Sequence, residues 1–186
     1  EGEIKKGRNL LAFEVAKRNV SNFLKVEQES IKNGDAIKIL ALEETFARQL
    51  THPNLPFPVL IKGNVDRIEE RNGIIRIIDY KTGKVEKASV TLKTWEALTE
   101  DIKTDKIIQV LAYAYMYEQE AKDKPIEAGI ISFKNLKAGF LPFNFKEDKE
   151  IYSIINEEIL SNYLEQMVLL LSEILDENVP FEEKLI

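Results

Sequence analysis

Two aspartates and a lysine stand among isoleucines in the middle of the chain: Asp66 in GNVDRI (63–68), and Asp79 and Lys81 in IIDYKTGK (77–84). Buried charges are costly unless they are paired or bind a metal. Carboxylates are the hard oxygen ligands that Mg²⁺ prefers, and a nearby ammonium can stabilise the charge that develops as a phosphodiester is hydrolysed. These residue types therefore suit metal-assisted phosphodiester hydrolysis.

Two strands joined by a tight turn are expected to carry these residues. Residues 59–69 and 74–81 are rich in β-branched side chains, and the connection 70–73 ends in Asn-Gly, which is typical of hairpins. The preceding residues 36–50 suit a strand or a helix. We favour a strand, because a meander is economical. A loop with three prolines, 51–58, would separate it from the hairpin.

Strand alternation decides which charged side chains share a face. Asp79 and Lys81 are two residues apart, so they project from the same face of the strand. Asp66 reaches that face if the register of the hairpin is suitable. On spacing alone, a lysine–aspartate pair that decorates an exposed hairpin explains Asp79 and Lys81 better than a catalytic site does.

The remaining residues alternate between helical and strand patterns. This order predicts an α/β or α+β domain with a central mixed β-sheet flanked by helices. Helices are expected at 9–32, 91–100, 105–122 and 147–178, the last being one helix or two, and strands at 126–134 and 139–145.

Composition excludes several classes of protein. The 186 residues contain no cysteine, which excludes disulfides, cysteine-ligated zinc or iron–sulfur clusters, and thiol catalysis. No apolar run approaches the roughly 20 residues that span a bilayer, so no membrane partner and a cytoplasmic location are expected. The net charge of −6 counts against a protein that coats DNA, but it is compatible with an enzyme that has a local basic groove.

The chain closely resembles the PD-(D/E)XK nuclease superfamily, and within it RecB/AddB-like nuclease domains. The resemblance rests on three segments that occur in the same order as the family's motifs: GNVDRI (63–68), IIDYKTGK (77–84) and QVLAY (109–113). The match covers about residues 40 to 120. The resemblance implies a restriction-endonuclease-like core, Mg²⁺ or Mn²⁺ as cofactor, and DNA as substrate. Relatives that hold an iron–sulfur cluster do so with four cysteines, which this chain lacks.

The resemblance implies a role for each residue of the first two motifs. Asp66 and Asp79 would be metal ligands, and the main-chain carbonyl of Tyr80 would complete the site. Lys81 would orient the attacking water or stabilise the pentavalent phosphate.

The third motif places Gln109 and Tyr113 one helical turn apart on a shared face. The resemblance implies that they position the DNA strand. Taken alone, the pair would fit an ordinary amphipathic helix. Its place in order after the aspartates and the lysine favours the functional interpretation.

Many relatives carry a further acidic or histidine ligand on an upstream helix. The single histidine, His52, lies in the proline-rich loop and is expected to be an exposed loop residue rather than a ligand. Glu43, Glu44 and Glu14 are the candidates, with Glu43 first because it lies closest to the motif strands. Alternatively, the ligand precedes residue 1.

Other side chains have two interpretations each. Tyr115 and Tyr117 could stack on bases, but core packing explains them better. The C-terminal helix suits the core, or it could dock on a helicase domain. Five lysines after the site could form a phosphate track or a solvated face: Lys84, Lys87, Lys93, Lys103 and Lys106.

The resemblance implies a DNA exonuclease module of repair or recombination, with residues 1–186 as one domain in the C-terminal part of a longer helicase–nuclease chain. The start at Glu1 rather than methionine agrees with that, and no phosphate-binding loop for a motor is present. The alternative is a nuclease-fold module with little or no catalysis that serves DNA binding or protein assembly.

Overall fold

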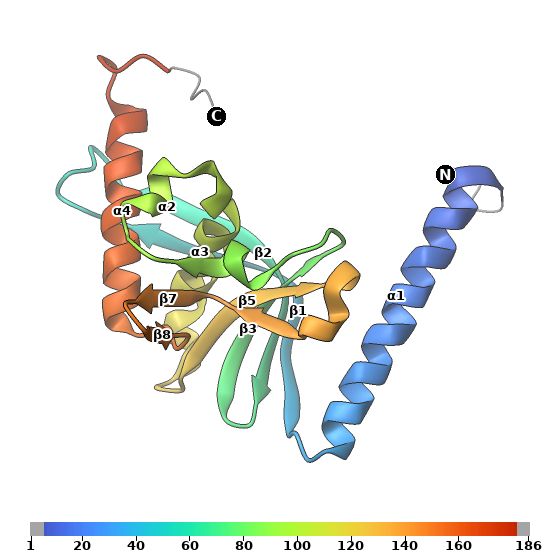
Figure 1. Cartoon of the computed structure of the whole chain (residues 1–186). Helices are drawn as coiled ribbons and strands as arrows, with labels where there is room; N and C mark the ends of the chain where they lie inside the picture. Colours follow the sequence, from blue (N-terminus) through green and yellow to red (C-terminus); the bar gives the residue numbers. More distant parts are fainter. Residues whose placement is uncertain (1–5, 182–186) are drawn as a thin grey trace.

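A five-stranded mixed sheet forms the centre of the computed structural model, which describes residues 6–181 (Figure 1). β1, β2 and β3 form an antiparallel meander, β5 runs parallel to β3, and β6 is antiparallel to β5. The mixed sheet and the strand at 36–50 are therefore confirmed. The bounds are β1 (Ile37–Leu50), β2 (Val59–Arg71), β3 (Ile74–Lys81), β5 (Ile126–Ser132) and β6 (Phe140–Pro142).

The β2–β3 turn is tighter than the predicted connection over 70–73. Arg71 pairs with Ile74, so only Asn72 and Gly73 form the turn. Both have positive φ, 54° and 86°. This is the backbone that two-residue hairpin turns need and that Asn-Gly adopts readily. The turn residues keep the two long strands in register up to their ends.

Helix α3 (Asp105–Tyr117) covers one face of the sheet, followed by the short 3₁₀ helix η3 (Glu118–Ala121). Helix α4 (Glu157–Leu175) packs on the far side of α3, beside α2 (Ala97–Glu100) (Figure 1). The core lies between sheet and helices and includes Val65, Ile68, Ile77, Val110, Leu111 and Ile130. In the described part of the chain, no helix is long and apolar enough to cross a membrane.

Helix α1 (Gly7–Lys32) confirms the predicted first helix but buries none of its residues. Its C-terminal half contacts the sheet face opposite α3, near η4 (Phe133–Ala138), and its N-terminal half projects away from the sheet (Figure 1). The apolar side chains of that half, which include Leu11, Phe13 and Val15, are exposed.

The predicted helix over 147–178 is wrong in its first third. β7 (Asn144–Glu147) and β8 (Glu150–Tyr152) form a hairpin there, with Asp148 at positive φ in the turn. Helix α4 begins only at Glu157, where the Asn156 side chain accepts a hydrogen bond of 2.9 Å from the Ile159 N–H. An N-cap of this kind marks a true helix start.

Two further predicted elements are divided in the structure. The predicted helix 91–100 consists of β4 (Thr91–Leu92) and the one-turn α2, with Trp95 between them. The predicted strand 139–145 divides between β6 and β7. Buried Phe143 still donates its backbone N–H to Ala128 of β5, and from Asn144 the chain belongs to a second sheet of order β4-β7-β8. The remaining short helices are η1 (Lys87–Val90) and η2 (Ile102–Thr104).

Candidate active site

Asp66 and Asp79 lie side by side on adjacent strands. Arg67 pairs with Ile78 in the β2–β3 register, and Asp66 and Asp79 are the next residues of the two strands on the side away from the turn. The Asp66 carboxylate accepts a hydrogen bond of 2.6 Å from the Tyr80 N–H. The hairpin register is therefore the one that places Asp66 on the same face as Asp79 and Lys81.

Asp79 is buried, and its charge is incompletely compensated. Its Oδ2 lies 2.9 Å from Lys81 Nζ, an ion pair, yet this buried oxygen accepts no well-aligned hydrogen bond from the part of the chain that the structure describes. Burial raises the pKa of Asp79, the ammonium of Lys81 lowers it, and the charge of Asp66 raises it. A second cation beside the two carboxylates would offset this cost, and a divalent metal fits the oxygen donors.

A chain of contacts joins the second motif to the third. Lys81 Nζ donates to Gln109 Oε1 at 2.9 Å, and Gln109 Nε2 donates to the Tyr113 hydroxyl at 2.8 Å. Burial raises the pKa of Tyr113, the hydrogen bond from Gln109 lowers it, and the charges of Asp79 and Asp66 raise it. The fold thus brings together the five side chains that the motifs singled out.

Gly63, the first residue of GNVDRI, makes room for Tyr113. A Cβ at Gly63 would lie 2.9 Å from Tyr113 Cε1 and 3.2 Å from Met116 Cε. Only glycine lets the ring approach β2 this closely. Our sequence interpretation gave Gly63 no role, although a glycine inside a strand is a signal for close approach.

A network of largely buried ion pairs lies behind the site, on the opposite face of β2. Arg67 contacts Glu27 of α1 at 2.7 Å and also pairs with Glu69. Arg71 contacts the same Glu27 and Glu69, each at 2.8 Å. Sequence analysis missed this network, because Glu27 stands 40 residues from Arg67 in the chain.

Tyr80 connects this network to the candidate site. Its hydroxyl accepts a hydrogen bond of 3.2 Å from Arg67, and its ring packs between Phe23 of α1 and Phe133, with 5.5 Å between centroids in each pair. The same residue holds Asp66 through its backbone N–H. The contacts of the Tyr80 ring and hydroxyl on one face of the sheet therefore help to hold the Asp66 carboxylate on the other face.

The upstream glutamates do not complete a cluster. Among residues 6–181, no three acidic or histidine side chains gather as a metal site. The β1–β2 register places Glu43 beside Asp66, but Glu43 is exposed at positive φ and accepts a hydrogen bond of 3.1 Å from Asn64. Glu44 is exposed, as is Glu14 in the projecting half of α1.

The two tyrosines after the third motif belong to the packed interior. Tyr115 is buried, with the Arg48 guanidinium 4.2 Å from its ring centroid. Tyr117 is half-buried and packs edge-on against Phe46. Of the five lysines that follow the site in the chain, Lys84, Lys87, Lys93 and Lys103 are exposed, and Lys84 pairs with Glu86. The fifth, Lys106, is half-buried and pairs with its neighbour Asp105.

Comparison with known proteins identifies a family to which the chain is similar. A family model of the PD-(D/E)XK nuclease superfamily matches residues 7–184. No curated protein matches the chain. A solved structure titled "Crystal structure of SSO0001" matches 81% of this chain with 14% sequence identity and a TM-score of 0.30, and the chain spans 58% of that protein. This structural likeness is too weak to support a conclusion.

Proposed function

The chain belongs to the PD-(D/E)XK nuclease superfamily, and from this premise we propose that it is a divalent-metal-dependent nuclease domain that hydrolyses phosphodiester bonds in DNA. The observation that carries the proposal is the continuous set of contacts from Asp79 through Lys81 and Gln109 to Tyr113. Acidic ligands, a cation and a polar helix face then converge on one side of the sheet.

Asp66 and Asp79 would hold Mg²⁺ or Mn²⁺, together with the main-chain carbonyl of Tyr80 and, as the proposed upstream ligand, Glu43. The metal would supply Lewis-acid stabilisation of the phosphate and a more acidic bound water. The under-compensated charge of buried Asp79 fits such a cation.

Lys81 is held in place before substrate arrives. Asp79 fixes its ammonium from one side and Gln109 from the other. A charge already oriented needs no reorganisation when negative charge develops, which is how such groups lower a barrier. Lys81 would orient the water or stabilise the pentavalent phosphate, while Gln109 and Tyr113 would position the DNA strand.

We propose further that the domain acts as an exonuclease in DNA repair or recombination, as the C-terminal part of a longer chain that includes or binds a helicase. The RecB/AddB-like order of the motifs supports this finer assignment. A second candidate is a nuclease-fold module with weak or no catalysis. It is favoured because no three acidic or histidine side chains gather as a metal site among residues 6–181.

The test is a cleavage assay on linear and circular DNA, single- and double-stranded, with Mg²⁺ or Mn²⁺. Asp79→Asn and Lys81→Ala should each lower the rate at least about 100-fold. Exposed Glu165→Gln and Lys149→Ala are the matched controls and should leave it unchanged. Cleavage that survives both site substitutions would refute the assignment.

Calorimetry with Mn²⁺ separates the two candidate functions. Metal binding that requires Asp79, together with cleavage, supports the enzyme. Metal binding without cleavage of any of these DNA forms supports the module with weak or no catalysis.

A further inference from the structure

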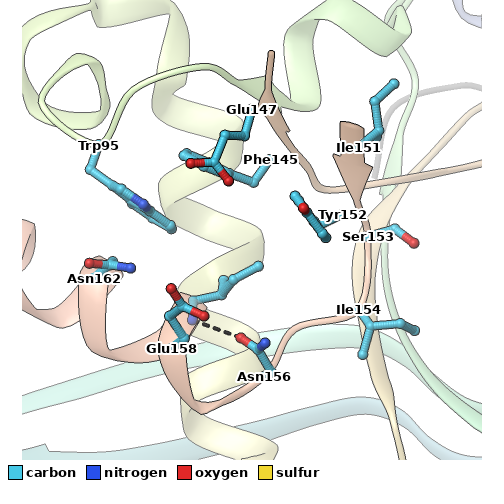
Figure 2. A pocket seen from close by; sticks show the side chains of 11 residues that line it. Trp95, Phe145, Glu147, Ile151, Tyr152, Ser153, Ile154, Asn156, Glu158 and Asn162 are labelled. Atoms are coloured by element: carbon cyan, nitrogen blue, oxygen red, sulfur yellow. Dashed lines mark hydrogen bonds between the residues drawn. The ribbon is translucent and has the colours of Figure 1, made fainter. Parts of the chain in front are cut away.

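A pocket of about 590 Å³ lies between the small sheet and the start of α4 (Figure 2). Its walls come from β7, β8, the segment before α2 and the first turns of α4. None of the residues that line it belongs to the three nuclease motifs. Its chemistry therefore needs a separate explanation.

One wall of the pocket is aromatic. Trp95 stacks on Phe145 with 5.0 Å between centroids and an interplanar angle of 14°. Tyr152 extends into the pocket from β8, and Figure 2 shows it facing the Trp95 side. The faces of aromatic rings carry partial negative charge and attract cations, tryptophan most strongly.

The charged side chains of the pocket are all acidic. Glu147 and Glu158 line it from β7 and α4, and no lysine or arginine does. Neither glutamate forms an ion pair with any residue from 6 to 181. Two unpaired carboxylates next to aromatic faces favour a cationic group and repel a phosphate.

The pocket also presents apolar surface. Ile151 and Ile154 line it and are 50% and 38% exposed. Exposed isoleucines beside a concave site provide a contact for an apolar side chain next to the cation.

We propose that this pocket binds an arginine or lysine side chain, followed by an apolar residue, in a peptide segment of a partner protein. The cation would lie against Trp95 between Glu147 and Glu158, and the apolar residue against Ile151 and Ile154. DNA would be excluded here by the same carboxylates. Neither Lys81 nor Gln109 lines the pocket, and the proposal does not depend on nuclease activity.

Trp95 is the single tryptophan of the chain, so intrinsic fluorescence reports on this pocket directly. The probe is a blocked peptide, acetyl-Gly-Arg-Leu-Gly-amide, and the comparison peptide carries glutamate in place of arginine. We expect a saturable change in emission with a Kd of about 1 mM, as suits a short flexible ligand. Binding should weaken as salt is raised.

The double variant Glu147→Gln/Glu158→Gln should lose at least about tenfold in affinity, the weakening expected when two nearby charges are removed. Glu173→Gln, an exposed change at the far end of α4, should leave binding unchanged. Circular dichroism checks that α4 is intact in both.

Three results would overturn the proposal. They are equal binding of the glutamate peptide, a larger Trp95 response to a short single-stranded oligonucleotide than to the arginine peptide, and no saturable response to the arginine peptide.

Discussion

The carboxylate of Asp66 accepts its hydrogen bond from the backbone N–H of Tyr80, 2.6 Å away across the β2–β3 hairpin. Tyr80 stands between Asp79 and Lys81, so this one bond fixes Asp66 relative to both. The Tyr80 ring and hydroxyl are held from behind by Phe23 and Arg67. The geometry of the candidate site therefore depends on how α1 docks on the opposite face.

Glu27→Gln should weaken both the fold and the site. Glu27 bridges Arg67 and Arg71. Without its charge, Arg67 keeps only Glu69 as an acidic partner among the described residues, and Arg71 keeps Glu69 and the more distant Asp35. We expect a loss of about 2–3 kcal/mol in the free energy of unfolding, measured with urea. Exposed Glu29→Gln on the same helix is the control and should cost under about 0.5 kcal/mol. Equal stability of the two variants would show that α1 contributes nothing through this network.

Asp79→Asn should stabilise the protein at neutral pH when no metal is added. Burial raises the pKa of Asp79, so the folded state binds this proton more tightly than the unfolded state. Stability from this group is therefore highest in acid and falls as pH rises through the raised pKa. The asparagine variant escapes that loss. Urea unfolding at several pH values should show that the variant is more stable than the wild type near pH 7. It should show no difference near the pKa that the Asp79 carboxyl has in the unfolded chain.

Added Mn²⁺ provides the complementary measurement for the same substitution. A metal that binds only the folded state stabilises it by mass action. Mn²⁺ should therefore raise the unfolding midpoint of the wild type and leave that of Asp79→Asn unchanged. A similar rise in both proteins would place the metal elsewhere.

Gly63→Ala should destabilise the protein by about 1–3 kcal/mol, the range for overpacking a filled interior. The new Cβ would press on the Tyr113 ring and displace it from Gln109. Gly83→Ala is the matched control, because a Cβ there meets nothing within 4 Å. Unfolding midpoints that agree within error would mean that the Tyr113 ring moves aside freely.

Gln109→Ala should slow cleavage about 10- to 100-fold and change stability little. Gln109 holds Lys81 and Tyr113 together, and small displacements of a catalytic group cost this much in rate. Single-turnover cleavage rates are the measurement, with exposed Gln119→Ala as the control. A wild-type rate would assign this glutamine a purely structural role.

The hairpin and the shared face of Asp79 and Lys81 could be predicted because both depend on local rules. Strand alternation and the Asn72–Gly73 turn act over a few residues. The order of the motifs assigned Gln109 to the same site as Lys81, but it predicted no contact between them, and the hydrogen bond is seen only in the structure.

The parts that sequence analysis missed depend on distant or opposing signals. The pairing of Glu27 with Arg67 joins two elements far apart in the chain, and no local pattern marks it. The β7–β8 hairpin lies among glutamates and lysines that suit a helix. Only Asp148 in the turn and the Asn156 cap reveal the interruption. Glu43 remains a proposed ligand, since it depends on side-chain placement that no pattern fixes.

The parallel pairing of β3 with β5 has a consequence for folding kinetics. β1, β2 and β3 join through local connections, whereas β5 pairs with β3 only after the chain between them, which contains α3, has closed a long loop. Contacts close in sequence form faster than distant ones. We therefore expect Asp66 and Asp79 to come together early in folding and Gln109 to reach Lys81 late. The two carboxylates would then be in place before the glutamine that orients the lysine.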